Sequence, residues 1–299
     1  MKYDVIVVTD CDHIRASDNP LIQTIQYEDG LVKQALTHLG LKAKIVSWDD
    51  PAVDWSETKS IVFRSTWDYF KRFEEFSVWL KSVSEKTILF NSKDTIYWNI
   101  DKHYLKDLAN RGINIATTHF INKGEHINLK SLHEKLGWKE TVLKPCVSGT
   151  ARHTYRLNAS NMDAHEILFQ QLITEESMML SPFQNDIVHT GERSLVLLNG
   201  VCTHAVLKVA KPGEFRVQES FGGSVQVHEP TQLEVKFAQM VVNACPELPI
   251  YARVDIFTDN NDELAVLEVE LIEPELWFRN NPPAALILAK ALKDKLNAH

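Results

Sequence analysis

Cysteine is scarce in this sequence, and its spacing suggests no cross-link between cysteines. The four cysteines, Cys11, Cys146, Cys202 and Cys245, lie far apart and form no C-x-x-C pair. That spacing favours neither a disulfide framework nor a zinc site. We therefore expect reduced cysteines that are mostly structural.

Long apolar runs and blocks of like charge are also missing. No stretch is long enough to cross a bilayer, and the first ten residues carry no cleavable signal pattern. With 32 Lys and Arg against 40 Asp and Glu, the formal net charge is −8, which argues against partners such as nucleic acid or an anionic membrane. We expect a cytoplasmic protein with a small-molecule partner. The oligomeric state stays open, with a homodimer as one possibility.

Two nucleotide-binding motifs are absent as well. Neither G-x-x-x-x-G-K-[ST] nor a G-x-G-x-x-G after a strand occurs, so kinase and dinucleotide-binding interpretations lose support. There is no internal repeat and no low-complexity tract. An ATP site in this chain would need other cations for its phosphates.

The first 93 residues alternate short apolar strands with helices, which predicts a small α/β domain. We expect strands at residues 3–9, 44–46, 61–63 and 87–90, and helices at 31–39 and 73–83. After residue 94 we expect a helix over 99–110, strands at 140–143, 153–157 and 178–180, a helix over 163–173, a hairpin at 195–209 and a terminal helix over 283–296. The predicted domains are residues 1–93, 94–183 and 184–299.

The segment from Pro249 to Leu271 predicts an antiparallel hairpin with a polar turn at 259–262. Its alternation places Arg253, Asp255, Glu268 and Glu270 on one face. Three carboxylates on one ribbon face repel one another unless they are solvated, paired or bound to a metal. Oxygen ligands suit Mg²⁺, which uses one or two carboxylates together with phosphates and waters. A solvated face with Arg253 as partial counter-ion is the open alternative.

Several cationic segments are candidates for a phosphate site. Lys144 ends a buried strand, where an ammonium needs an anion unless it extends to the surface. Lys102 is expected in a helix with Lys106, where a solvated position is the simpler interpretation. Residues 208–223 combine Lys and Arg with glycine, as in a loop that covers phosphates or in an ordinary surface loop.

The segment FRSTWDY at residues 63–69 follows a strand of the first domain. It offers Arg64, Ser65, Thr66 and Asp68 to a small charged substrate. Trp67 and Tyr69 are more typical of packing than of binding.

Taken in order, these segments resemble the ATP-grasp superfamily, in its glutathione-synthetase-like branch and closest to the O-ureido-serine cyclo-ligase type. The resemblance covers nearly the whole chain. It depends on FRSTWDY, WNIDKHYL at 98–105, VLKPCVSGTARHTYR at 142–156, SPFQNDIVHTGERSLVLLNG at 181–200, HAVLKVAKPGEFRVQESFGG at 204–223, and ARVD with LEVELIEP. It implies an α/β ATP-grasp fold with an N-terminal pre-ATP-grasp domain.

The resemblance also implies site residues. Phosphates of ATP would meet Lys102 and Lys144 under a loop with Ser148 and Gly149, and the hinge Ser181, Pro182, Phe183 and Gln184 would hold adenine. Ribose would meet Glu192, Mg²⁺ would meet Asp255, Glu268 and Glu270, and Arg216 would act with Lys144 in catalysis.

Three departures from the pattern matter. Glu270 stands where many relatives have Asn, the loop after Lys144 has a single glycine, and Pro182 cannot donate a main-chain hydrogen bond, so the adenine donor would be another residue such as Gln184. The segment Glu275 to Asn280 has no assigned role.

The implied reaction uses ATP to convert a carboxylate into an acyl phosphate, which an amine then attacks, so no side-chain nucleophile is needed. We expect a small, amino-acid-like substrate. Two alternatives remain: an intramolecular cyclo-ligase, and an ATP-binding sensor module without turnover.

Overall fold

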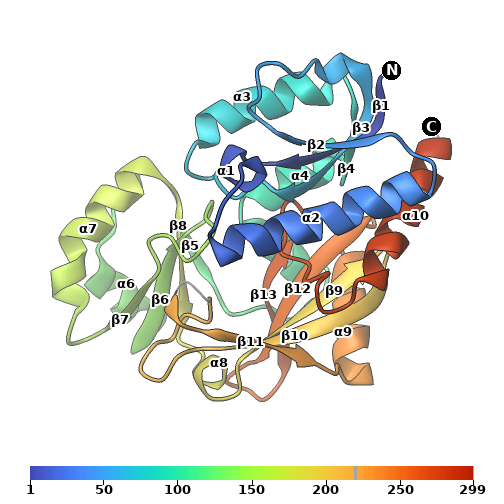
Figure 1. Ribbon diagram of the computed structural model, residues 1–299. Coiled ribbons are helices and arrows are strands. Elements are labelled where there is room, and N and C mark those ends of the chain that lie inside the picture. Colours follow the sequence, from blue (N-terminus) through green and yellow to red (C-terminus); the bar gives the residue numbers. More distant parts are fainter. Residues whose placement is uncertain (219–220, 299) are drawn as a thin grey trace.

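The computed structural model describes residues 1–218 and 221–298. Glu219 and Ser220, within the predicted phosphate-covering loop, lie outside the described residues. Three sheets organise the chain, with the small green sheet beside the blue N-terminal and the yellow-to-red C-terminal sheets (Figure 1). This mixed α/β architecture is the predicted one.

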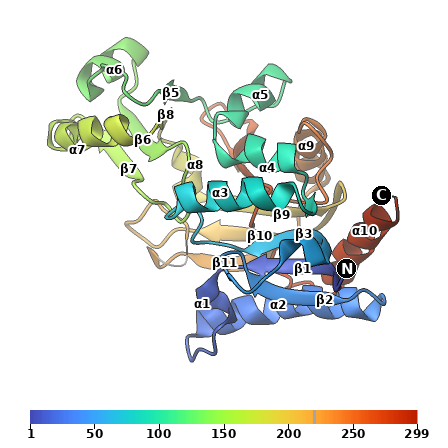
Figure 2. The ribbon, with the colours of Figure 1, turned by 90° about the horizontal axis from the view of Figure 1, so that it is seen from above.

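The N-terminal sheet is parallel, with the order β2-β1-β3-β4. Both of its faces are covered, because Val5 and Val7 pack towards α2 whereas Ile6 and Val8 pack towards α3. Figure 2 shows the sheet between these two helices. The elements are β1 (Tyr3–Thr9), α1 (Cys11–Ile14), α2 (Pro20–His38), β2 (Ala43–Ser47), a 3₁₀ turn (Trp55–Glu57), β3 (Thr58–Ser65), α3 (Phe73–Ser84) and β4 (Ile88–Phe90).

A smaller antiparallel sheet, β5-β8-β6-β7, forms the central unit. Leu132, Leu143, Phe169 and Leu180 fill the core between this sheet and its two helices. The elements are β5 (His119–Ile121), α6 (Leu129–Leu136), β6 (Glu140–Pro145), β7 (Tyr155–Asn158), α7 (Met162–Glu175) and β8 (Met178–Pro182).

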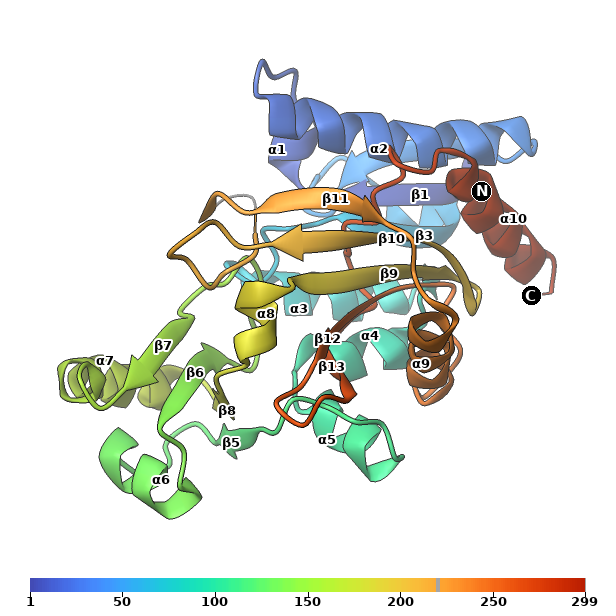
Figure 3. The ribbon, with the colours of Figure 1, turned by 90° about the horizontal axis from the view of Figure 1, so that it is seen from below.

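The C-terminal sheet, β11-β10-β9-β12-β13, is antiparallel. One face packs on α9, which lies beside the sheet in Figure 3. The other face is apolar under residues 276–278 and polar at its far end. The elements are α8 (Asn185–His189), β9 (Glu192–Leu198), β10 (Val201–Val209), β11 (Ser224–His228), α9 (Gln232–Asn243), β12 (Tyr251–Thr258), β13 (Leu264–Glu270) and α10 (Pro283–Asn297).

The predicted helix over 99–110 is wrong in one respect. The structure has two helices, α4 (Lys93–Ile100) and α5 (Tyr104–Asn110), and Lys102 lies in the turn between them. The Asp101 side chain accepts the His103 backbone N–H at 2.9 Å, and the extended backbone of Asp101 ends α4. The strand predicted at 153–157 likewise starts only at Tyr155, because His153 has a positive φ.

The segment from 93 to 110 packs with the two outer sheets. Ile96 and Ile100 join the N-terminal core, and Tyr104 and Leu108 join the core of the C-terminal sheet. The limits of the three domains stay a prediction; this segment is absent from the core between the small sheet and α6 and α7, but Leu105 and Leu108 share a cluster with Phe120 and Met179 on the other face of that sheet.

The unassigned segment Glu275 to Asn280 joins the first domain to the last. Leu276, Trp277 and Phe278 are buried in a core that includes Val5, Val62 and Val196. Arg279 forms ion pairs with Glu28 and Glu275. This segment therefore helps to hold the N-terminal sheet against the apolar part of the C-terminal sheet.

Candidate ATP site and active site

One cavity of about 380 Å³ lies where the three sheets meet. Its walls come from the N-terminal domain through Trp67 and Phe70, from the small sheet, and from the polar end of the C-terminal sheet. It includes thirteen predicted residues: Lys102, Lys144, Ser148, Gly149, Ser181, Pro182, Phe183, Gln184, Glu192, Arg216, Asp255, Glu268 and Glu270. Residues separated by as much as 168 positions in the sequence therefore share one site.

The register of β12 and β13 produces the carboxylate face. Arg253 lies opposite Glu270 and Asp255 lies opposite Glu268, as the alternation predicted. Asp255 and Arg253 are only 2% and 9% exposed, so this part of the face is not solvated, although Arg253 does act as a counter-ion, to Asp255 and Glu270. Buried carboxylates require partners.

Each of these carboxylates faces a cation. Lys102 lies 2.9 Å from Glu268, and Asp255 contacts Arg253 at 2.8 Å and Lys208 at 3.1 Å. Arg253 also pairs with Glu270. The face is an internally compensated ion network before any ligand binds.

The pKa values follow from burial and these pairs. Burial alone would raise the pKa of Asp255, but Arg253 and Lys208 outweigh it and hold that pKa low. Burial raises the pKa of Glu270 to about 7, with Glu268 and Asp255 adding to the rise against Arg253. Glu192, buried beside Lys208, also has its pKa raised to about 7. The network thus holds carboxylates that differ widely in proton affinity.

Lys144 differs from Lys102. In the described part of the chain the Lys144 ammonium forms no ion pair, and it is partly exposed to the cavity. Burial, with Lys102 nearby, lowers its pKa despite the attraction of Glu268. An ammonium in this position is ready to receive an anion.

The loop after β6 covers this end of the cavity. The Lys102 ammonium also donates to the Ser148 carbonyl at 2.8 Å. A Cβ added at Gly149 would lie 2.7 Å from the Phe70 ring, so glycine allows the loop to approach the N-terminal domain closely.

The hinge lies between the small and C-terminal sheets. Phe183 N–H donates to the Glu140 carbonyl at 2.9 Å, and the Phe183 carbonyl accepts from the Asn260 side chain at 3.1 Å. Since Pro182 has no N–H, the main-chain donor that remains in this hinge is Gln184.

Arg216 lines the cavity but is held by its neighbours. Its guanidinium makes two contacts with Glu214 and lies 3.7 Å from the centre of the Phe221 ring. It would have to leave Glu214 to contact a phosphate.

The four predicted substrate residues do not line this cavity. Arg64 is 3% exposed, donates to the Pro274 carbonyl at 3.1 Å and lies 3.4 Å from Asp29. Ser65 donates to Asp29, Thr66 is fully buried, and Asp68 binds Arg72 and Trp48. Arg64 and Ser65 instead border a hollow of about 10 Å³, room for about one water. Their role in substrate binding stays a prediction that this geometry does not favour.

Residues without an assigned role at the site also line the cavity, among them Glu273 and Trp67, together with Lys208 of the candidate phosphate loop and Arg253 of the carboxylate face. Burial and the nearby Glu270 raise the pKa of Glu273 to about 8. The cross-strand pairing of Lys208 with Glu192 could have been found from the hairpin at 195–209, whereas nothing in the sequence signals Glu273, which follows the end of β13.

Residues 111–269 match the model of the prokaryotic glutathione synthetase ATP-grasp domain, just over half of the chain. The chain belongs to this ATP-grasp family. It is an ATP-dependent ligase that forms a carbon–nitrogen bond between a carboxylate and an amine. Residues 5–91 match the N-terminal domain of D-cycloserine synthetase. The predicted fold and family are confirmed, and the alternative of a sensor without turnover is wrong.

Relatives of this ATP-grasp ligase agree with the family. It is 28% identical over 286 residues to the cycloserine biosynthesis protein DcsG of Streptomyces lavendulae, with 91% of this chain and 95% of that protein covered. The crystal structure of D-cycloserine synthetase DcsG matches with a TM-score of 0.86 at 26% identity, covering 98% and 99% of the two chains. The D-alanine–D-alanine ligase of Bacillus anthracis has the same fold, with a TM-score of 0.66 at 14% identity and 99% and 98% covered.

Proposed function

We propose that the cavity binds ATP and Mg²⁺ and joins a carboxylate to an amine of a small, amino-acid-like substrate. The observation that carries the proposal is Lys144, which forms no ion pair among the described residues and lines the same cavity as Asp255, Glu268 and Glu270. An all-oxygen donor set next to a phosphate-sized cationic site fits Mg²⁺, which prefers to complete its shell with phosphates and waters.

The binding of nucleotide would proceed by an exchange of partners. Lys102, Lys208 and Arg253 now compensate the carboxylates. When phosphates enter, these cations gain anionic partners there, and the carboxylates become available to the metal. Since neither partner alone restores the balance of charge, we expect Mg²⁺ and ATP to bind cooperatively.

Each remaining residue has a proposed part. Gln184 donates its main-chain N–H to adenine in the hinge, Glu192 accepts from ribose, and Ser148 and Gly149 close over the phosphates. Bound Mg²⁺ would supply electrostatic stabilisation of the transferring phosphoryl group. Lys144 and Arg216 offset the charge that moves towards the leaving ADP.

The reaction has two steps. A substrate carboxylate oxygen attacks the γ-phosphorus, breaking its bond to the β-γ bridging oxygen, which gives an acyl phosphate and ADP. The amine then attacks the acyl carbon, phosphate leaves, and the amine loses a proton. Trp67 and Phe70 form the wall on the N-terminal side, where they would exclude water from the intermediate.

An intramolecular reaction is a second candidate. Its support is the match of residues 5–91 to the N-terminal domain of D-cycloserine synthetase, together with the similarity to the cycloserine biosynthesis protein along most of the chain. In this version one substrate carries both the carboxylate and the attacking nitrogen, as a ureido amino acid does.

No described helix has the length and apolar character needed to span a membrane. We propose the cytoplasm as the location, where ATP and small amino-acid-like substrates are available, and we leave a homodimer as a proposal.

Release of ADP from Mg·ATP tests the function. The assay compares amino acids, dipeptides and ureido amino acids, with wild type beside Glu268→Gln. Compounds that stimulate ADP release in wild type but not in the variant would name the substrate class. Mass spectrometry of the product separates a cyclised compound from a joined pair. ATP binding without stimulation by any of these compounds would contradict the proposed substrate class.

A further inference from the structure

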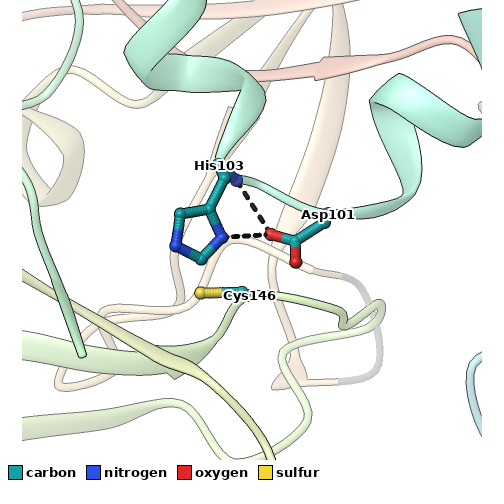
Figure 4. A group of neighbouring side chains, drawn as sticks. All are labelled: Asp101, His103 and Cys146. Carbon is teal, nitrogen blue, oxygen red and sulfur yellow. Dashed lines mark hydrogen bonds and ion pairs between the residues drawn. The ribbon is translucent and has the colours of Figure 1, made fainter. Parts of the chain in front are cut away.

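Three side chains outside the cavity lining lie together at the base of the loop that follows β6 (Figure 4). Asp101 and His103 come from the turn between α4 and α5, and Cys146 follows the end of β6. One nitrogen, oxygen or sulfur atom of each lies within 4.8 Å of the other two. Among the described residues, no other group of three His, Cys, Asp or Glu side chains meets this distance.

The backbone holds the group in place. Lys102 N–H donates to the Cys146 carbonyl at 2.9 Å, and Cys146 N–H donates to the Ser177 carbonyl at 2.9 Å. The His103 ring stacks on Phe120 with 4.4 Å between the ring centres. The three side chains therefore meet through fixed main-chain contacts.

The three side chains differ in hydrogen bonding and in exposure to solvent. The Cys146 residue is 1% exposed, and its thiol has no hydrogen-bond partner in the described part of the chain. Asp101 and His103 form a contact of 2.6 Å between Oδ1 and Nδ1, and their side chains are 45% and 31% exposed. A buried sulfur thus faces an imidazole and a carboxylate that solvent can reach.

We propose that Asp101, His103 and Cys146 bind a thiophilic divalent cation of the zinc class. Sulfur, nitrogen and oxygen donors on a small tetrahedral site suit this ion, with the fourth position open to water. Nothing in the sequence indicates such a site, because Cys146 has no neighbouring cysteine and its two partners lie more than 40 positions away.

Only small movements are required. Zinc bonds of about 2.0–2.3 Å keep neighbouring ligand atoms roughly 3.3–3.7 Å apart. The Asp101–His103 contact would open by less than about 1 Å on the same basis, and the sulfur would approach. Burial raises the pKa of the Cys146 thiol to about 12, so the thiol stays protonated without metal. On binding, the sulfur–hydrogen bond breaks, a sulfur–metal bond forms, and the proton leaves to solvent.

Nearby lysines have two opposite effects on metal binding at this site. The ammonium groups of Lys102, Lys106 and Lys144 favour the Cys146 thiolate, but they repel an incoming cation. Lys102 lies between two of the ligands and contacts Glu268 and Ser148. A bound ion would therefore fix the position of Lys102. Any effect of the ion on ATP binding rests on the proposed role of Lys102 at the phosphates.

Cobalt titration of the full, reduced, metal-free chain tests the site. We expect a thiolate-to-cobalt charge-transfer band that saturates at one equivalent and that Zn²⁺ removes. Binding of cobalt to the cavity carboxylates gives no such band, because they carry no sulfur. This readout is independent of ATP turnover, so failure of the proposed ligase function would not affect it.

Variants assign the ligands. Cys146→Ser should abolish the band, and Asp101→Asn should weaken cobalt binding at least about tenfold. Cys245→Ser is the matched control, since that buried thiol lacks carboxylate and imidazole partners, and it should retain the band. No band in wild type, or a band that survives Cys146→Ser, would overturn the proposal. If Cys146→Ser does not fold, unchanged affinity in both Asp101→Asn and His103→Asn would overturn it.

Discussion

The carboxylate face of β12 and β13 and the strand end after β3 carry similar residue types, but they are used differently. Arg253 and Asp255 face the cavity, with cations and carboxylates from three further segments around them. Arg64 and Asp68 do not line the cavity: Arg64 pairs with Asp29 of its own domain and donates to the Pro274 carbonyl of the C-terminal part, and Asp68 pairs with Arg72. A charged residue in the right sequence motif becomes a site residue only if the fold leaves it facing open space.

Lys144→Met should produce the largest effect on the cavity side of this comparison. Removing an unpaired cation opposite the proposed phosphates should lower kcat/KM for ATP by about 10³. The ligand-free melting temperature should stay equal or rise, because an ammonium disfavoured by burial is lost. Kinetics and thermal melts measure both, with the exposed Lys139→Met as control. A lower melting temperature with normal kinetics would show that Lys144 is structural.

Arg64→Met should have its effect on stability instead. The variant leaves Asp29 buried without its cation, which should lower the free energy of unfolding by about 3 kcal/mol. Molecules that remain folded should keep their KM for the acceptor substrate. Urea denaturation and steady-state assays separate the two, with the exposed Arg15→Met as control. A large rise in KM at unchanged stability would restore the predicted contact with substrate.

Glu273→Gln should reveal the pH dependence of the cavity. The folded protein raises the pKa of Glu273 from 4.5 to about 8. The folded state therefore binds a proton that the unfolded state releases, and this contribution to stability is present below pH 4.5 and is lost as pH rises through 8. The variant should match wild type near pH 5 and melt higher than wild type above pH 8.

The comparison of wild type with Glu273→Gln requires thermal melts without ATP and with a metal chelator. Glu192 and Glu270 titrate in the same direction and contribute to both proteins. The exposed Glu229→Gln serves as control. An unchanged difference between wild type and Glu273→Gln from pH 5 to 9 would contradict the assigned pKa.

Gly149→Ala should have the smallest effect. The new methyl group meets the Phe70 ring, a side chain that can shift in place of backbone, so the KM for ATP should rise only a few-fold. Phe70→Leu in the same chain should recover most of the loss, which a double-mutant cycle measures. Additive effects of the two changes would show that the loop and the N-terminal domain do not approach as described.

The strands that the sequence predicted best are those with a strict alternation. In β12 and β13 the period of two predicts the shared face of Arg253, Asp255, Glu268 and Glu270, whereas the register, which shifts between Asp255 and Ile256, comes from the structure. What it could not show is that Lys102 and Lys208 compensate that face, because those pairs join positions 47 to 166 residues apart. Lys102 was misplaced in a helix since the Asp101 turn depends on one side-chain hydrogen bond.

The direction of the side chains at the end of β3 was harder to predict. A parallel strand covered on both sides shows no alternation, so the sequence does not tell which way Arg64 points. Its direction is set by Asp29 on α2 and by the Pro274 carbonyl near the C-terminus.

A crystal structure with Mg²⁺ and a non-hydrolysable ATP analogue tests the central claim most directly. The account predicts adenine at Gln184, the γ-phosphate within hydrogen-bond distance of the Lys144 ammonium, and a metal ion held by the carboxylates of β12 and β13, with Lys102 shifted towards phosphate. A nucleotide bound elsewhere, or one whose phosphates leave Lys144 unpaired and the ion pairs of Asp255 and Glu268 unchanged, would contradict it.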